Sequence, residues 1–118
     1  KEYALEFPFK LDPSLFEEAV NTEQKVAIGS NRITFNGSPK EQFFFSNLTG
    51  STSKNAAWTL LNSTAKIGIQ ETGNFQTDKV NLWGWGHVIS PELFFKISIK
   101  PGELSNWSRA YEVFNINP

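Results

Sequence analysis

Apolar and polar residues alternate along most of this chain, which is the pattern of β-strands with one buried face. In the segment YALEFPFKL (residues 3–11) every odd-numbered position is apolar. The segment ELFFKISIK (residues 92–100) alternates in the same way. Because Pro8 cannot donate a ladder hydrogen bond, we expect the first of these strands to lie at a sheet edge or to carry a bulge.

Short strands of this kind recur about every dozen residues and are separated by Gly, Asn, Ser and Pro, which indicates an antiparallel β-sandwich or jelly roll of about seven to eight strands. The segment VNLWGWGHVI (residues 80–89) is predicted to be one such strand, ending at Ser90-Pro91. One short helix is predicted near residues 13–20, because Asp12 can cap it and Pro13 suits its first position.

The length, charge and amino-acid composition of the chain make several classes of binding partner unexpected. The chain has 118 residues, which fits one domain over residues 1–118. Its 11 basic and 12 acidic residues form no basic stripe, so nucleic acid is not an expected partner. No apolar run approaches the roughly 18 residues of a membrane span, so membrane insertion is not expected. The absence of cysteine excludes disulfides and thiolate chemistry.

The surface chemistry favours a location outside the cell or on its surface. Asn, Ser and Thr are frequent, and four tripeptides match the Asn-x-Ser/Thr pattern, beginning at Asn36, Asn47, Asn62 and Asn106. The chain begins with Lys1 and contains no methionine. We therefore expect a processed or excised module of a larger secreted or cell-surface protein, linked to a catalytic or surface-anchored domain.

The residues needed for catalysis are scarce. His87 is the only histidine, and no G-x-S-x-G nucleophile motif accompanies it. We therefore expect that the protein is not an enzyme and has no cofactor. Calcium takes carboxylate and carbonyl oxygens, but Asp12 and Asp78 are the only aspartates and no D-x-D-x-D loop is present. A structural calcium site thus stays open without support from the sequence.

Aromatic residues supply the best candidate chemistry. In NLWGWGH (residues 81–87) strand periodicity places Trp83, Trp85 and His87 on one face, and Leu82, Val88 and the glycines on the other. In NWSRAYE (residues 106–112) Trp107, Arg109 and Tyr111 share a face. Trp58, between pairs of Ala and Leu, is predicted to belong to the core. The predicted ligand-binding residues are Asn81, Trp83, Trp85, His87, Trp107, Arg109, Tyr111 and Glu112.

Two interpretations of these tryptophans are open. Exposed indoles can stack on the C–H faces of sugar rings while polar neighbours bind the ring hydroxyls, which predicts a non-catalytic module that binds a polysaccharide or glycan. Alternatively, the tryptophans are hot spots of a protein interface in an adhesion or assembly module. Against both stands a structural role, because a buried tryptophan is common in sandwich cores.

Overall fold

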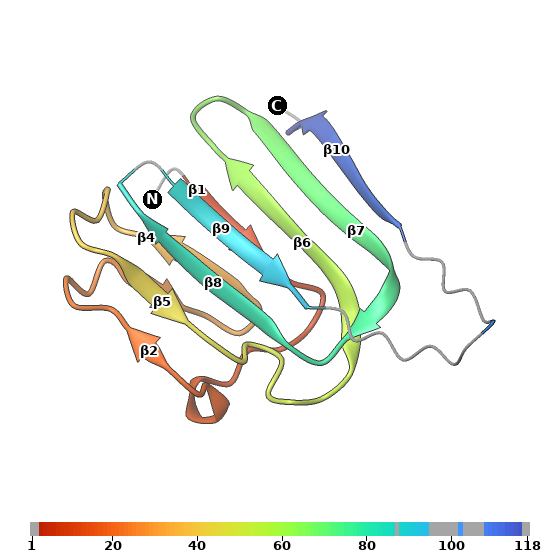
Figure 1. The fold of residues 1–118 in the computed structure, drawn as a ribbon. Coiled ribbons are helices and arrows are strands. Elements are labelled where there is room, and N and C mark those ends of the chain that lie inside the picture. Colours follow the sequence, from red (N-terminus) through yellow and green to blue (C-terminus); the bar gives the residue numbers. More distant parts are fainter. Residues whose placement is uncertain (1–2, 87, 95–101, 103–107, 117–118) are drawn as a thin grey trace.

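The computed structural model describes residues 3–86, 88–94, 102 and 108–116, and this part of the chain is all-β. Its strands form a six-stranded sheet, in the order β10-β7-β6-β1-β4-β3, and a four-stranded sheet, in the order β2-β5-β8-β9 (Figure 1). Neighbouring strands are antiparallel in both sheets. The strands are β1 (Tyr3–Glu6), β2 (Ala19–Val20), β3 (Val26–Ile28), β4 (Arg32–Phe35), β5 (Phe43–Phe45), β6 (Lys54–Asn62), β7 (Ile67–Thr77), β8 (Val80–Trp85), β9 (Val88–Leu93) and β10 (Arg109–Asn115).

The core lies between the two sheets. Leu5 and Ile33 enter it from the larger sheet, and Phe43 and Leu82 enter it from the smaller one. These residues expose at most 2% of their surface. Burial of such side chains is the main stabilising contribution, at about 1.5–3 kcal/mol for each large apolar residue. The predicted all-β class is therefore confirmed, with the sheets facing each other as in a sandwich.

The larger sheet extends beyond the smaller one. Leu5, Leu60, Ile69 and Val113 are paired in one row across β1, β6, β7 and β10, so all four point to the core side. Leu5 is fully buried, whereas Ile69 is 36% exposed and Val113 is 70% exposed. In Figure 1, β9 lies in front of β1, while β7 and β10 lie to the right of the smaller sheet, beyond β6. The core side of these outer strands is thus open to solvent among the described residues.

The predicted strand number is too low. The described residues form ten strands, because β2 forms where a helix was predicted and the segment predicted as one strand at residues 80–89 divides between β8 and β9. The jelly-roll topology is not confirmed. The edge position predicted for the first strand is wrong, because β1 pairs with both β4 and β6. It ends at Glu6, so Pro8 lies after it and interrupts no ladder.

The helix predicted near residues 13–20 is wrong. Only one 3-10 turn forms, Pro13–Leu15, capped by the Asp12 side chain, which accepts a hydrogen bond from the Ser14 N–H. The hydrogen bonds of the next residues go to another segment: the Glu17 N–H donates to the Ser46 carbonyl, and the Glu18 N–H to the Ser46 Oγ. Tertiary pairing thus replaces the helix, and β2 follows against β5.

The segment at residues 80–89 is not one strand. It folds back as a hairpin after Gly86, so that β8 and β9 are antiparallel and Trp85 pairs with Val88. Gly86 has φ of +54°, a value that glycine adopts without strain. Ser90 and Pro91 lie within β9, where proline is tolerated because β9 is an edge strand of the smaller sheet. Residues 95–100 of the second alternating segment lie outside the described residues.

Gly84 provides a test of this packing. It faces the core, and a Cβ atom built there would lie 2.3 Å from the Val88 carbonyl oxygen and 2.5 Å from Cζ of Phe43. We expect Gly84→Ala to lower the free energy of unfolding by about 2 kcal/mol, the typical cost of overpacking. Urea denaturation measures the effect, with Ser90→Ala in the same hairpin as the control. A stability equal to that of the control would show that Gly84 is not packed in this way.

Candidate functional site

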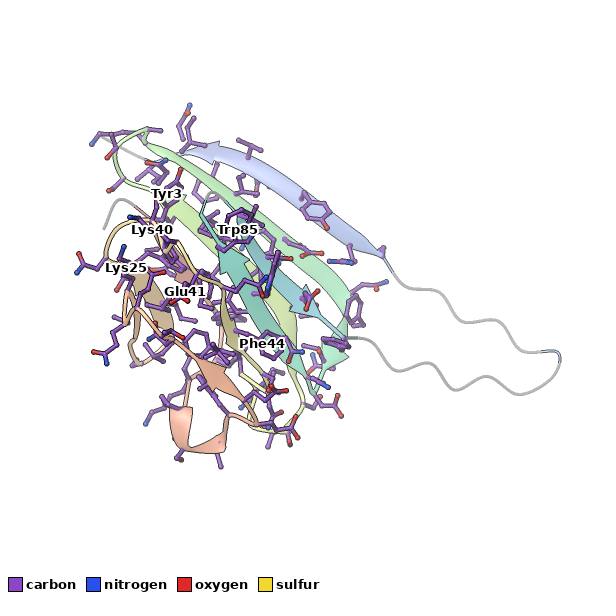
Figure 2. The ribbon with its side chains drawn as sticks, turned by 60° about the vertical axis from the view of Figure 1, so that its left-hand side comes forward. Tyr3, Lys25, Lys40, Glu41, Phe44 and Trp85 are labelled. Carbon is purple, nitrogen blue, oxygen red and sulfur yellow. The ribbon has the colours of Figure 1, made fainter. Side chains whose placement is uncertain are left out.

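The outer face of the smaller sheet carries a row of mostly apolar side chains. Val20, Phe44, Trp83 and Ser90 are paired across β2, β5, β8 and β9, and each alternates with a residue that faces the core. Leu82, for example, is fully buried, whereas its neighbour Trp83 is half-buried on the outside. We call this row, together with Trp85 and Val88, the outer aromatic face. Figure 2 labels two of its aromatic residues, Phe44 and Trp85.

Trp85 is the most accessible aromatic residue of the outer aromatic face. Its side chain is 48% exposed, at the end of β8. It lines a hollow of about 460 Å³ that is otherwise bounded by Ser38, Pro39, Lys40, Gly86 and Val88. The predicted face for Val88 is wrong, because the hairpin returns it to the same side as Trp85. The hollow therefore has an indole wall, apolar neighbours and a small number of polar groups at its rim.

The loop of residues 37–41 that bounds this hollow is tied to the rest of the protein at three points. The Gly86 N–H donates to the Pro39 carbonyl at 2.7 Å. Lys25 Nζ donates to the Ser38 carbonyl, and the Glu41 N–H donates to a carboxylate oxygen of Glu23. The bond from Glu41 also lowers the pKa of Glu23. Figure 2 labels Lys25, Lys40 and Glu41 around this loop. These hydrogen bonds hold the loop, and with it the rim of the hollow, in place.

Trp83 and Asn81 have roles that differ from that of Trp85. Trp83 Nε1 donates to the Gln42 Oε1 at 3.3 Å, so its indole N–H is already engaged. Asn81 is buried, and its Oδ1 accepts a hydrogen bond from the Asn47 N–H. Asn47 is also buried, and its Nδ2 donates to the Leu15 carbonyl. Asn81 therefore holds a loop in place, and the folded chain does not present Asn47 for glycosylation.

The second predicted stretch lies on the other sheet. Trp58, Glu71 and Tyr111 are paired in one row across β6, β7 and β10, on the core side. The Glu71 side chain is only 1% exposed, and it accepts a hydrogen bond of 2.6 Å from Trp58 Nε1. Arg109 forms an ion pair with the same carboxylate through Nε. Trp58 is packed against the core, as predicted, with its N–H satisfied by a buried acid.

The buried Glu71 carboxylate contributes to shifts in the pKa values of Arg109 and Tyr111. The hydrogen bond that Arg109 donates to Glu71, and the negative charge of that carboxylate, raise the pKa of Arg109 above its ordinary value. Desolvation of the Tyr111 hydroxyl and its hydrogen bond with Glu71 raise the pKa of Tyr111. The Tyr111 side chain as a whole is still 62% exposed, so its ring is accessible while its hydroxyl group interacts with the acid.

The predicted site residues therefore do not form a single site. Trp83 and Trp85 lie on the outer aromatic face, whereas Arg109 and Tyr111 lie on the core side of the larger sheet. Glu112 points to the opposite face of β10 from Tyr111, as its neighbouring position predicts. His87 and Trp107 lie outside the described residues.

Sequence analysis missed Phe44, Gln42 and the loop of residues 37–41. The period-two pattern in FFF (residues 43–45) could have identified Phe44 as outward-facing, since its two neighbours are buried. Nothing in the sequence places residues 37–41 beside Trp85, because that contact depends on the Gly86–Pro39 hydrogen bond.

The chain matches no protein-family model, and no curated protein sequence or solved structure is significantly similar to it. Within the described residues, no helix has the length and apolar character needed to cross a membrane. The same residues contain no group of three or more His, Cys, Asp or Glu side chains that could hold a metal ion.

Proposed function

We propose that this protein is a non-catalytic carbohydrate-binding module that binds a polysaccharide or glycan through Trp85. The observation that carries the proposal is the half-exposed indole beside a hollow of about 460 Å³. An indole presents a large apolar surface with electron density on its face, which suits the C–H groups of a pyranose ring. Ser38 and Lys40 supply groups that can bind ring hydroxyls.

In this proposal the residues next to Trp85 also contact the glycan. Trp83, held by Gln42, extends the aromatic surface along β8 toward a second sugar residue. Two positions along a strand span about 7 Å, a little more than one sugar ring. Ser90 lies beside Trp83 on β9 and offers a further hydroxyl. A secreted or cell-surface location, a sandwich of jelly-roll type and attachment to a larger protein belong to the same proposal.

The test is a glycan array followed by affinity measurements on variants. We expect Trp85→Ala to weaken binding of the best glycan by about 30-fold, corresponding to the 2 kcal/mol of a hot-spot residue. Tyr111→Ala is the matched control, because it removes an exposed aromatic residue from the other sheet. We expect its affinity to equal that of the wild type. An absence of any bound glycan, or an unchanged affinity in Trp85→Ala, would contradict the proposal.

A second candidate function is self-assembly through β10, favoured by a separate observation. Among the strands that the structure describes, β10 is the edge of the larger sheet, and it runs for seven residues. An edge strand presents unpaired backbone groups that can pair with another strand. Antiparallel pairing of two β10 strands about a twofold axis at Val113 would join the exposed Tyr111 and Val113 side chains of both copies.

This candidate has its own experiment. We expect sedimentation at increasing concentration to show a dimer that Val113→Pro abolishes, since proline cannot donate the ladder hydrogen bond. Val88→Ala on the smaller sheet should leave the dimer intact. A wild-type chain that stays monomeric at all concentrations would rule out this function without bearing on glycan binding.

A further inference from the structure

A second hollow lies between the two sheets, on the inner side of the loop of residues 37–41. Its volume is about 500 Å³, within the range of ligand-binding pockets. Its lining includes Phe35, Phe43, Leu60, Ile69 and Ile89. The larger sheet provides Phe35, Leu60 and Ile69, and the smaller sheet provides Phe43 and Ile89. We call it the inter-sheet cavity. It reaches the surface beside Tyr3, which is 37% exposed and labelled in Figure 2.

The lining limits what this cavity can hold. None of the described lining residues carries a charge; the polar side chains are those of Tyr3 and Ser38. No buried side-chain nitrogen or oxygen of the described residues lacks a hydrogen-bond partner. Ordered water needs two to four polar partners, and cavities lined by apolar side chains stay dry and bind apolar molecules. An uncharged occupant with an apolar chain therefore suits the inter-sheet cavity better than an ion does.

We propose that the inter-sheet cavity binds the alkyl chain of an uncharged amphiphile, whose hydroxyl head group stays at the mouth beside Tyr3 and Ser38. The mouth is held in shape by the hydrogen bond from the Gly86 N–H to the Pro39 carbonyl. This bond ties the loop to the β8–β9 hairpin, and Ser38, Pro39, Gly86 and Val88 line both the cavity and the hollow at Trp85. The proposal does not rest on glycan binding, because the alkyl chain would contact Phe35, Phe43, Leu60, Ile69 and Ile89, none of which lines the hollow at Trp85.

Calorimetric titration with straight-chain 1-alkanols of four to ten carbons tests the proposal directly. Each methylene buried should strengthen binding about fourfold, from roughly 0.8 kcal/mol per CH₂. The gain should stop at the chain length that fills the cavity. The absence of binding by every alkanol, or an affinity independent of chain length, would overturn the proposal.

Substitutions in the lining of the inter-sheet cavity test whether the alkanol binds there. We expect Ile89→Phe and Leu60→Phe, which add volume to the lining, each to weaken 1-octanol binding at least tenfold. Val113→Phe is the matched control, because Val113 lies in the same paired row as Leu60 but is 70% exposed. Its affinity should be unchanged. Circular dichroism checks that each variant folds.

If Ile89→Phe or Leu60→Phe does not fold, Leu60→Ala is the second test, because this substitution enlarges the cavity. The chain length at which the affinity stops rising should then increase. A limit that does not move would overturn the proposal. Binding of alkanols without any glycan binding would support the inter-sheet cavity and reject only the function proposed for Trp85.

Discussion

Leu82→Ala is expected to lower the free energy of unfolding by about 3 kcal/mol. Leu82 is fully buried on β8 and is paired with Phe45 and Pro91 on the neighbouring strands. Its truncation removes buried apolar surface and leaves a cavity that a strand fixed on both sides cannot close. Urea denaturation measures this change, and the slope of the unfolding free energy against urea concentration should be the same for the variant and the wild type.

The control for this prediction is Trp85→Ala, three residues along the same strand. A tryptophan is the larger side chain, yet nearly half of Trp85 already lies in water. We therefore expect its removal to cost about 1 kcal/mol, less than the loss at Leu82. The reverse order of stabilities would mean that β8 is turned over and that the tryptophans form part of the core.

Strand periodicity predicted the faces of β8 correctly because it depends only on neighbouring residues. Trp83 and Trp85 share the outer face, and Leu82 and Gly84 the inner one, as alternation requires. It failed for Val88, because the hairpin at Gly86 reverses the chain and restarts the alternation. A lone Gly-His pair is a weaker turn signal than Asn-Gly or Asp-Gly, so the sequence did not locate this reversal.

The candidate site was harder to predict than the strands, because it depends on which strands are neighbours. The two aromatic stretches look alike in sequence, yet β8 joins the smaller sheet and β10 the larger one. The same limit explains the missing helix: the signals at Asp12 and Pro13 are real and produce one turn. Ser46, directly after β5, then provides the hydrogen bonds that compete with further helix, and nothing local in the sequence reveals its position.

The ion pair between Arg109 and Glu71 gives the last prediction. We expect Arg109→Ala to lower the free energy of unfolding by about 3 kcal/mol. Glu71 is 1% exposed, so loss of the guanidinium leaves a buried carboxylate whose hydrogen bonds with Trp58 Nε1 and the Tyr111 hydroxyl come from neutral groups. Removing one partner of a buried pair costs about 3–5 kcal/mol. The lower end applies because the Arg109 side chain is 36% exposed and water can approach once it is removed.

Two further variants separate this electrostatic cost from a general loss of packing. Arg32→Ala breaks the ion pair between Arg32 and Glu6, whose side chains are 52% and 30% exposed. Because this pair is accessible to water, we expect its loss to lower the free energy of unfolding by less than about 1 kcal/mol. Adding Glu71→Gln to Arg109→Ala should recover at least 1 kcal/mol, because a neutral amide still accepts the Trp58 N–H without a buried charge. A double variant no more stable than Arg109→Ala would attribute the loss to packing of the arginine stem. A loss as small as that of Arg32→Ala would show that Glu71 reaches water in solution, and hence that β10 does not cover β7 as closely as the register requires.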